Sequence, residues 1–396
     1  MALRFFMATG WYMQTLVVSW TIWSITHDPL MLGMVGLAEA VPAIGTALPM
    51  GYLVDKLEKK RAIVFAASVI LVSAICTGVA VQTASIAAIG QPTTITILLA
   101  MVVLNGLARA LYSPSMFSVL STVASVEIMP RAAAMSSAAW QGAMMIGPMT
   151  AGILYGSFGA FVAAIVTISF MFIGTAAIIY IPRIPPTPHI SRGSLLANVS
   201  IGLRFIFSNQ IILGALSLDM FAVLFGGAVA LLPVFADNIL HVDAGGLGML
   251  RAAPSLGSVI TMAWLSLHPP TKNTGRILLY AVSAFGVATI CFALSTNFVL
   301  SLAILACIGA ADAVSVVVRH TILQLHTPED MRGRVSAANT MFISSSNEIG
   351  SLESGVAASL MGTVPSVVFG GVMTLVVVSV IALKAPLLRR MRLGSE

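Results

Sequence analysis

The stretch that decides the fold is AIVFAASVILVSAICTGVAV, residues 62–81, which directly follows Lys59-Lys60-Arg61. It contains no charged residue, and its length matches the roughly 20 residues that an α-helix needs to cross a bilayer. Similar runs recur along all 396 residues, of which 58% are apolar and 9% charged, with a mean hydropathy of +1.00. About a quarter of the residues in a soluble domain are charged. The composition therefore indicates a polytopic membrane protein and excludes soluble domains, a nucleic-acid binder and a disordered chain.

The apolar runs predict an all-α polytopic fold with twelve transmembrane helices in two bundles of six. The predicted spans are residues 4–26, 30–54, 61–82, 94–117, 132–157, 159–182, 210–235, 244–267, 276–295, 298–320, 333–361 and 363–386. Residues 1–182 are expected to form the N-terminal bundle, 183–209 a cytoplasmic linker, and 210–396 the C-terminal bundle with a short cytoplasmic tail. Within the linker, residues 195–207 are compatible with an amphipathic surface helix.

The basic residues predict the orientation. They gather in alternate loops, near residues 56–61, 183–204, 272–276, 332–334 and 384–392, whereas the opposite loops contain no Lys or Arg. By the positive-inside rule both termini are cytoplasmic. The net charge of +6 is therefore a feature of membrane topology. The three cysteines lie inside apolar runs without CxxC spacing, which implies neither a disulfide framework nor a metal site.

The two halves are related by an internal repeat. A shift of 212 residues places Gly33, Gly36, Pro42 and Gly45 on Gly245, Gly248, Pro254 and Gly257. A shift of 203 places Gly106, Arg131, Gly147 and Gly152 on Gly309, Arg334, Gly350 and Gly355. Two halves of parallel topology suit a transporter that works by rocking one bundle against the other.

Charges change sign across this repeat. Glu39 falls on Arg251, and Arg109 falls on Asp312. A charge near mid-membrane costs at least about 2.5 kcal/mol on insertion scales, so such residues face a cavity or a partner. Two interpretations stay open: fixed structural ion pairs, or proton and substrate sites whose contacts change during a transport cycle.

Further ionisable residues lie inside predicted spans. Asp219 and Asp312 are the deeper carboxyl groups and can bind and release protons. Arg319 lies near a span end and is expected to be an interfacial anchor whose side chain reaches the headgroups. Glu348 and Glu353 are five residues apart, about 140° around a helix, so they cannot share one face. The small polar residues around them indicate either close helix packing or a cavity wall.

The first span contains three of the five tryptophans. Trp11 and Trp23 are compatible with an interfacial belt, whereas Tyr12, Gln14 and Trp20 lie nearer the middle. An aromatic and mostly uncharged wall favours flat or lipophilic substrates.

The loop after the second span reads Gly51-Tyr52-Leu53-Val54-Asp55-Lys56-Leu57-Glu58-Lys59-Lys60-Arg61. It resembles the signature between spans two and three of the major facilitator superfamily, which has a glycine, an aspartate four residues on, and then basic residues. The resemblance implies a cytoplasmic gating motif formed by Gly51, Asp55, Lys59, Lys60 and Arg61. The aspartate at a helix end can pair with basic groups in one conformational state only.

The fifth span contains Gly142, Gly147, Pro148 and Gly152. This pattern resembles the Gly-Pro motif of antiporters in the same superfamily. Such a motif allows the helix to kink and to pack tightly against the other half, which helps to prevent leak. A role in packing alone fits the same residues.

A resemblance over nearly the whole chain rests on the segments 26–30, 218–227, 250–254, 327–337, 347–350 and 353–355. They resemble the bacterial branch that includes the enterobactin exporters and related efflux proteins. The resemblance implies a proton-driven exporter of siderophore- or drug-like molecules in the inner membrane. It also implies a cavity lined by spans 1, 4, 7 and 10. We expect Asp312 and Asp219 to respond to protons there, and Arg109 to modulate them or to bind an anionic group.

The alternatives are a proton-coupled importer of a nutrient and a non-transporting membrane receptor. An enzyme is disfavoured because no histidine lies at mid-membrane and neither an HExxH motif nor a Gly-rich phosphate loop occurs. We expect no cofactor other than the proton gradient and no metal. The expected partners are the bilayer, protons and a small molecule, with no nucleic acid, and the protein is expected to be a monomer.

Overall fold

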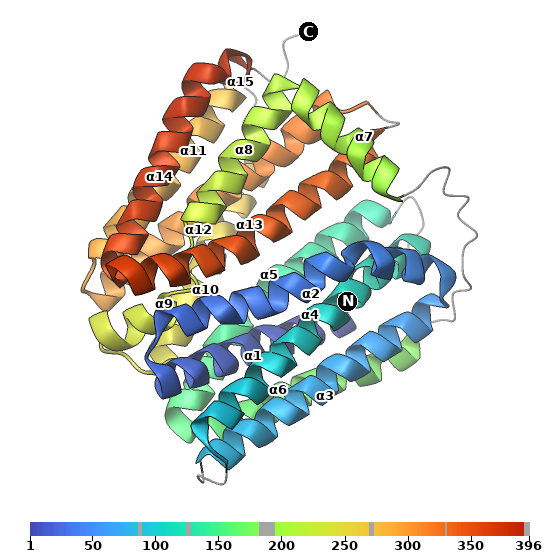
Figure 1. Ribbon diagram of the computed structural model, residues 1–396. Helices are drawn as coiled ribbons and strands as arrows, with labels where there is room; N and C mark the ends of the chain where they lie inside the picture. Colours follow the sequence, from blue (N-terminus) through green and yellow to red (C-terminus); the bar gives the residue numbers. More distant parts are fainter. Residues whose placement is uncertain (86–88, 124–127, 182–194, 269–272, 329–330, 392–396) are drawn as a thin grey trace. The chain divides into compact units, whose positions relative to one another are not determined.

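The computed structural model describes residues 1–85, 89–123, 128–181, 195–268, 273–328 and 331–391. These residues form helices joined by short turns, and no β-strand occurs among them (Figure 1). The chain divides into two compact units. Unit 1 contains Met1–Ile190 and Pro233–Ala252, and unit 2 contains Ser191–Leu232 and Ala253–Glu396.

The described part of unit 1 consists of six long helices and one short segment from later in the chain. The helices are α1 (Ala2–Thr26), α2 (Pro29–Lys56), α3 (Lys59–Ser85), α4 (Gln91–Val123), α5 (Met129–Phe158) and α6 (Ala160–Ala176), which ends in the 3₁₀ turn η1 (Ala177–Tyr180). The later segment contains most of α9 (Leu232–Val234), the π-helix η2 (Phe235–Ile239) and the first turns of α10 (Ala244–Leu267).

The described part of unit 2 contains the rest of α10 and seven further helices. They are α7 (Leu195–Ser208), α8 (Gln210–Phe225), α11 (Thr274–Leu294), α12 (Phe298–His326), α13 (Arg332–Met361), α14 (Thr363–Lys384) and α15 (Pro386–Arg390). A helix, α7, therefore occupies the part of the linker where one was expected. Its Ile206 is fully buried against side chains of α8, α12 and α13, and its Gly202 lies against the backbone of Arg334.

Many of the helices have the length and composition of membrane spans. Among the described residues, seven helices are long and apolar enough to cross a membrane, and α7 with α8 forms a further candidate bent by 105°. α1, α5, α10 and α13 have 25, 30, 24 and 30 residues and contain more small and polar residues. Such helices pack closely against other helices, where small side chains allow a near approach.

The internal repeat is present in the packing. α1 packs on α5 and α6, and α3 packs on α4 and α6; correspondingly α8 packs on α13 and α14, and α11 packs on α12 and α14. Figure 1 shows α11 and α14 side by side in unit 2. The glycine contacts repeat as well. A Cβ at Gly106 would collide with the backbone of Glu39 and the ring of Pro42, and a Cβ at the equivalent Gly309 would collide with the backbone of Pro254.

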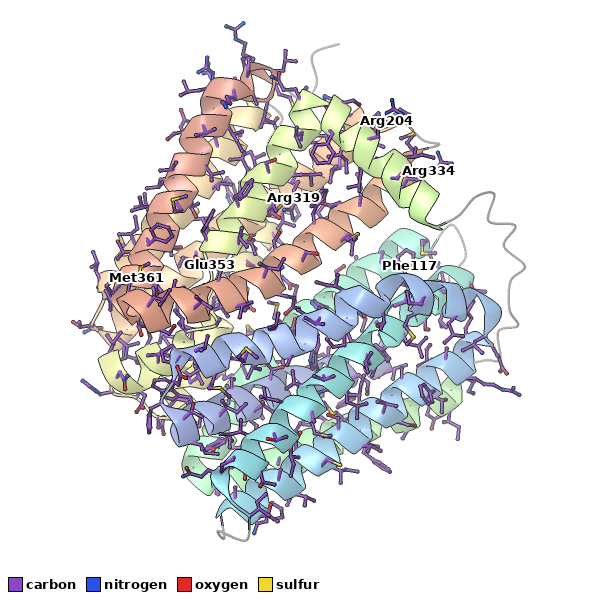
Figure 2. All side chains as sticks on the ribbon, in the orientation of Figure 1. Phe117, Arg204, Arg319, Arg334, Glu353 and Met361 are labelled. Atoms are coloured by element: carbon purple, nitrogen blue, oxygen red, sulfur yellow. The ribbon has the colours of Figure 1, made fainter. Side chains whose placement is uncertain are left out.

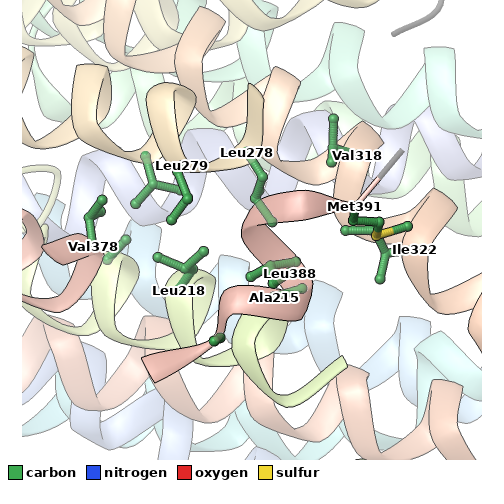
Figure 3. Close-up of a cluster of buried hydrophobic side chains, with 12 residues drawn as sticks. Ala215, Leu218, Leu278, Leu279, Val318, Ile322, Val378, Leu388 and Met391 are labelled. Atoms are coloured by element: carbon green, nitrogen blue, oxygen red, sulfur yellow. The ribbon is translucent and has the colours of Figure 1, made fainter. Parts of the chain in front are cut away.

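Each unit has its own apolar core. In unit 1 the core includes Met7, Ile63 and Met171. In unit 2 it joins α8, α11, α12, α14 and α15, and the close-up in Figure 3 shows Leu218 and Val318 among its members. Since lipid tails are as apolar as these side chains, the cores stabilise the units mainly through close packing.

The prediction of one continuous helix over 210–235 is wrong. α8 ends at Phe225, residues 226–231 form turns, and helical structure resumes as α9 and η2. Two adjacent glycines, Gly226 and Gly227, open the break, and Pro233 lacks the N–H that a continuing helix needs. The freed backbone groups form short bonds instead, such as Ala230 N–H to Gly227 O at 3.1 Å.

Candidate functional site

An ion pair joins α2 and α4 in unit 1. Gly106 brings the two backbones close together, and Arg109 follows one turn later on α4. The Arg109 Nη1 atom lies 3.0 Å from Oε1 of Glu39, and the two side chains are 34% and 13% exposed. Two charges that the sequence placed separately in the second and fourth spans are therefore partners within the first half.

Aromatic rings surround this ion pair. The Arg109 guanidinium carbon lies 4.3 Å from the centroid of the Trp11 ring, within the range of a cation–π interaction. Tyr12 and Trp140 complete the group, with ring centroids 5.6 Å apart.

Arg4 is a second cation beside these rings. Its guanidinium is 5.5 Å from the Trp140 centroid and donates a hydrogen bond to Ser136 Oγ. Tyr12 and Arg109 were expected to act at one site, whereas Arg4, Ser136 and Trp140 were missed. Trp140 lies in a stretch of small residues of α5, and no pattern there distinguishes it from a packing residue.

Gln14 serves helix packing in this structure. Its side chain is buried, and its Nε2 donates to Ser73 Oγ at 3.2 Å and to Thr77 Oγ1 at 2.9 Å on α3. Its Oε1 accepts a hydrogen bond of 3.0 Å from Asn105 Nδ2 on α4. The amide therefore ties α1 to α3 and α4. Trp20, on the same helix, is half-buried.

The equivalent region of the second half places Asp312 one turn after Gly309 on α12. The α10–α12 contact at Gly309 is tightened by Ser258 Oγ, which donates to the Gly309 carbonyl at 2.8 Å. Asp312 is half-buried, and among the described residues it has neither a hydrogen bond nor an ion pair. Arg251, on the turns of α10 that belong to unit 1, donates through Nη2 to Ser19 Oγ of α1 at 2.9 Å.

Asp219 and Arg319 form a buried ion pair in unit 2. The pair joins α8 to α12, and the two side chains are 7% and 3% exposed. Figure 2 labels Arg319 within unit 2. The prediction that Arg319 is an interfacial anchor is therefore wrong, because its guanidinium turns inward to a carboxylate. Asp219 is the partner of a fixed cation here, which sets it apart from Asp312.

α13 packs on α8 through small residues. A Cβ at Gly350 would meet the backbone of Leu224, and one at Gly227 would meet the side chain of Ser354. Glu348 and Glu353 on this helix are both half-buried, and Ser354 Oγ lies 3.5 Å from the Glu353 carboxylate. Small residues of α13 thus contribute to helix packing, as one of the two interpretations predicted.

The glycines of α5 have unequal roles. A Cβ at Gly147 would meet Thr9 O of α1 at 2.9 Å. A Cβ at Gly152 would collide with the backbone of Gly248, near the start of α10. At Gly142 the closest atom to a Cβ would be 3.6 Å away, an ordinary contact. The two glycines on either side of Pro148 therefore allow α5 to pack tightly on both neighbours.

The gating motif is described in part. The surroundings of Gly51 and the side chain of Asp55 lie outside the described part of the structure. Lys59 is 1% exposed. Lys60 Nζ donates to the carbonyls of residues 179 and 181, at 3.0 and 2.6 Å, where a cation complements the end of the α6–η1 helix. Arg61 pairs with its neighbour Glu58 at 2.8 Å on the surface.

A further cluster that the sequence did not predict lies at the end of α1. Trp23 is 1% exposed, and its indole N–H donates to Asp237 Oδ2 of η2 at 2.9 Å. His27 Nδ1 lies 3.7 Å from the same carboxylate oxygen. Nearby, the Tyr155 hydroxyl of α5 and Thr21 Oγ1 are 3.1 Å apart. The contacts of Asp237 fasten the segment after the break to α1 within unit 1.

A family model described as Major Facilitator Superfamily matches residues 1–351 of the 396. The chain belongs to this superfamily. It is accordingly a multi-pass membrane transporter and not an enzyme. Among the described residues, no group of three His, Cys, Asp or Glu side chains is arranged to hold a metal ion.

Curated relatives are similar to part of this transporter. It is 27% identical over 248 residues to the enterobactin exporter EntS of Escherichia coli O1:K1 / APEC and to that of Shigella boydii serotype 18. The matched region is 63% of this chain and 59% of the length of each exporter.

Solved structures of other transporters have the same fold. The similarity to a POT family transporter in complex with 5-aminolevulinic acid has a TM-score of 0.75 at 11% identity and covers 98% of this chain and 95% of that one. For the nucleoside transporter NupG the TM-score is 0.71 at 14% identity, with coverage of 96% and 98%. At such identities the likeness concerns the fold alone.

Proposed function

We propose that this transporter exports a small amphipathic molecule, siderophore- or drug-like, in exchange for protons. The observation that carries the proposal is its similarity to proteins named enterobactin exporters, at 27% identity over 248 residues. The superfamily supplies the alternating-access framework, in which two repeated bundles open a central site to one side of the membrane at a time. On this proposal the protein lies in a bacterial inner membrane with both termini in the cytoplasm.

The proposed architecture has twelve spans. The seven apolar helices and the bent pair account for eight of them, and α1, α5, α10 and α13 supply the rest. The shortest of these four, α10, has 24 residues, which corresponds to about 36 Å of helix and exceeds a hydrocarbon core of about 30 Å. The test is a C-terminal fusion to a reporter enzyme that is active only outside the cytoplasm. Activity of this fusion would contradict the proposed topology.

Asp312 is the proposed proton carrier. Its carboxyl group is half-buried near the middle of α12, and no cation among the described residues is paired with it. A carboxyl group that alternates between water and a dry environment gains and loses a proton as its hydration changes. Asp219 is bound to Arg319, and we propose a structural role for it.

The test measures substrate-linked proton movement in everted membrane vesicles with an acidified lumen. The panel contains lipophilic cations, macrolides and catecholate siderophores. We expect at least one class to raise the pH of the lumen as it enters, and Asp312→Asn to abolish that response. Asp28→Asn is the matched control, because Asp28 caps the N-terminus of α2 by accepting from Leu30 N–H, a role that asparagine fills about as well.

Two results would contradict the proposal in different ways. Substrate uptake without a change of pH in the lumen would exclude proton antiport. Full coupling in the Asp312→Asn variant, with the protein present at normal amounts, would exclude Asp312 as the carrier and leave export itself intact.

A further inference from the structure

Five side chains of unit 1 form what we call the cation–aromatic cluster: Arg4, Trp11 and Tyr12 of α1, Arg109 of α4 and Trp140 of α5. We propose that this cluster is the subsite for a planar aromatic group that carries one negative charge, such as an aryl carboxylate. The inference rests on the proposed transport function and specifies the chemistry of the transported molecule.

The three rings contact one another in tilted and edge-to-face arrangements. The centroid of Trp11 lies 5.2 Å from that of Tyr12 and 5.7 Å from that of Trp140, and Tyr12 and Trp140 are 5.6 Å apart. The interplanar angles are 31°, 49° and 69°, so no two of these rings form a parallel stack. Aromatic groups prefer offset or edge-to-face contacts at such distances, and a ligand ring can add a further contact of the same kind.

The charges of the cluster are not balanced. Arg109 is paired with the carboxylate of Glu39, whereas Arg4 donates to the neutral hydroxyl of Ser136. Among these residues, two guanidinium groups and one carboxylate leave one positive charge. A ligand with one negative charge would complete the balance, and a planar guanidinium is well suited to bind a carboxylate through two N–H groups.

The position of Arg109 indicates that the cluster faces water rather than lipid. Arg109 lies near the middle of α4, which runs over 33 residues, and its side chain is 34% exposed. An arginine at that depth is not an interfacial anchor, and exposure to hydrocarbon would be costly. Trp11, Tyr12 and Trp140 are likewise half-buried, whereas the neighbouring Met13 is fully buried.

The dimensions fit a molecule larger than a single ring. Arg4 and Trp11 are seven residues apart on α1, which corresponds to about 10 Å along the helix axis. On the proposal, a fused bicyclic ring with a carboxylate lies against Trp140 and Tyr12 while its charge meets a guanidinium. A saturated ring of the same size would keep the charge and lose the ring contacts.

The test is a calorimetric titration of the purified full-length protein in detergent, with no proton gradient. The probes are 2-naphthoate, the neutral naphthalene-2-methanol, and decahydronaphthalene-2-carboxylate, which is anionic but not aromatic. We expect 2-naphthoate to bind at least about tenfold more tightly than either of the others, since both the ring contacts and the charge contribute. Trp140→Leu should weaken its binding about tenfold, and Arg4→Gln should remove the preference for the anion over the neutral probe.

Trp264→Leu is the matched control. Trp264 belongs to unit 2, is 58% exposed and stacks on His268, so its loss should leave naphthoate binding unchanged. Equal affinity for the three probes, no binding of 2-naphthoate at millimolar concentration, or equal binding in the wild type and a folded Trp140→Leu variant would each overturn the proposal. The Arg4→Lys variant keeps the charge and tests the guanidinium geometry if Arg4→Gln does not fold.

The two proposals fail separately. If naphthoate binds as expected but no panel compound moves protons in vesicles, the subsite stands and proton-driven export does not. If panel compounds move protons but the titration shows no preference for an aromatic anion, export stands and this subsite is rejected.

Discussion

Removal of the Asp219 carboxylate should destabilise unit 2 more than removal of the whole ion pair. In Asp219→Leu, the Arg319 guanidinium would remain in a site where its side chain is 3% exposed and where its neighbour Val318 belongs to the apolar core. A guanidinium cannot lose its proton under these conditions. Breaking one side of a buried pair costs about 3–5 kcal/mol, and replacing both partners by apolar residues of similar volume is often neutral. We therefore expect the double variant Asp219→Leu/Arg319→Met to recover most of the stability that Asp219→Leu alone loses.

The measurement is a double-mutant cycle on purified protein, unfolded by titration of SDS into mixed micelles and followed by circular dichroism. Arg319→Met alone should cost less than Asp219→Leu, because a lone carboxylic acid can take up a proton. If the double variant were as unstable as the sum of the two single variants, the ion pair would not be the source of the effect. In vesicles the double variant should keep substrate-linked proton movement; its loss in a folded protein would assign Asp219 to the proton path.

Three other predictions follow from packing and hydrogen bonds. Gly257→Ala should lower the free energy of unfolding by about 1–3 kcal/mol, because the new Cβ would meet the Ala306 carbonyl. Gly45→Ala, at the repeat-equivalent position, should leave that free energy unchanged or raise it by up to about 1 kcal/mol. Equal shifts of the thermal unfolding midpoint in the two variants would contradict this prediction. Gln14→Leu should lower the free energy of unfolding by about 1–3 kcal/mol, because Asn105 would lose its hydrogen-bond acceptor. An altered KM for transport in this variant would instead place the amide at the substrate site. Trp23→Phe keeps an aromatic ring but removes the N–H that Asp237 accepts, and it should cost at least about 1.5–3 kcal/mol in the SDS titration; unaltered stability would show that water replaces this bond.

The sequence was most informative where a contact requires the absence of a side chain. The repeat aligned Gly106 with Gly309, and in the structure each lies against the backbone of a second helix from its own half. The Gly-Pro pattern of α5 likewise predicted close packing, which occurs at Gly147 and Gly152. A glycine in an apolar helix marks a near approach of two backbones whatever rotamers the neighbours adopt.

The sequence did not predict the direction in which long side chains point. Arg319 lies toward one end of α12, and its depth alone could not distinguish a side chain that reaches the headgroups from one that turns to Asp219. Trp140 was missed for a related reason, since its contacts with Trp11 and Tyr12 depend on how α5 is rotated against α1. Residue type and position along a helix do not fix that rotation.

The break after α8 has a mechanical consequence. The N–H groups of Ala228, Ala230 and Leu231 bond to carbonyls only two or three residues back, so a change of angle there breaks no α-helical hydrogen bond of theirs. Gly227 is held against Ser354 of α13, which fixes one side of the joint. Unit 1 takes up the chain again from residue 233, two residues after the turns end. The backbone torsions between α8 and α9 can therefore change without breaking the α-helical hydrogen bonds of the helices on either side.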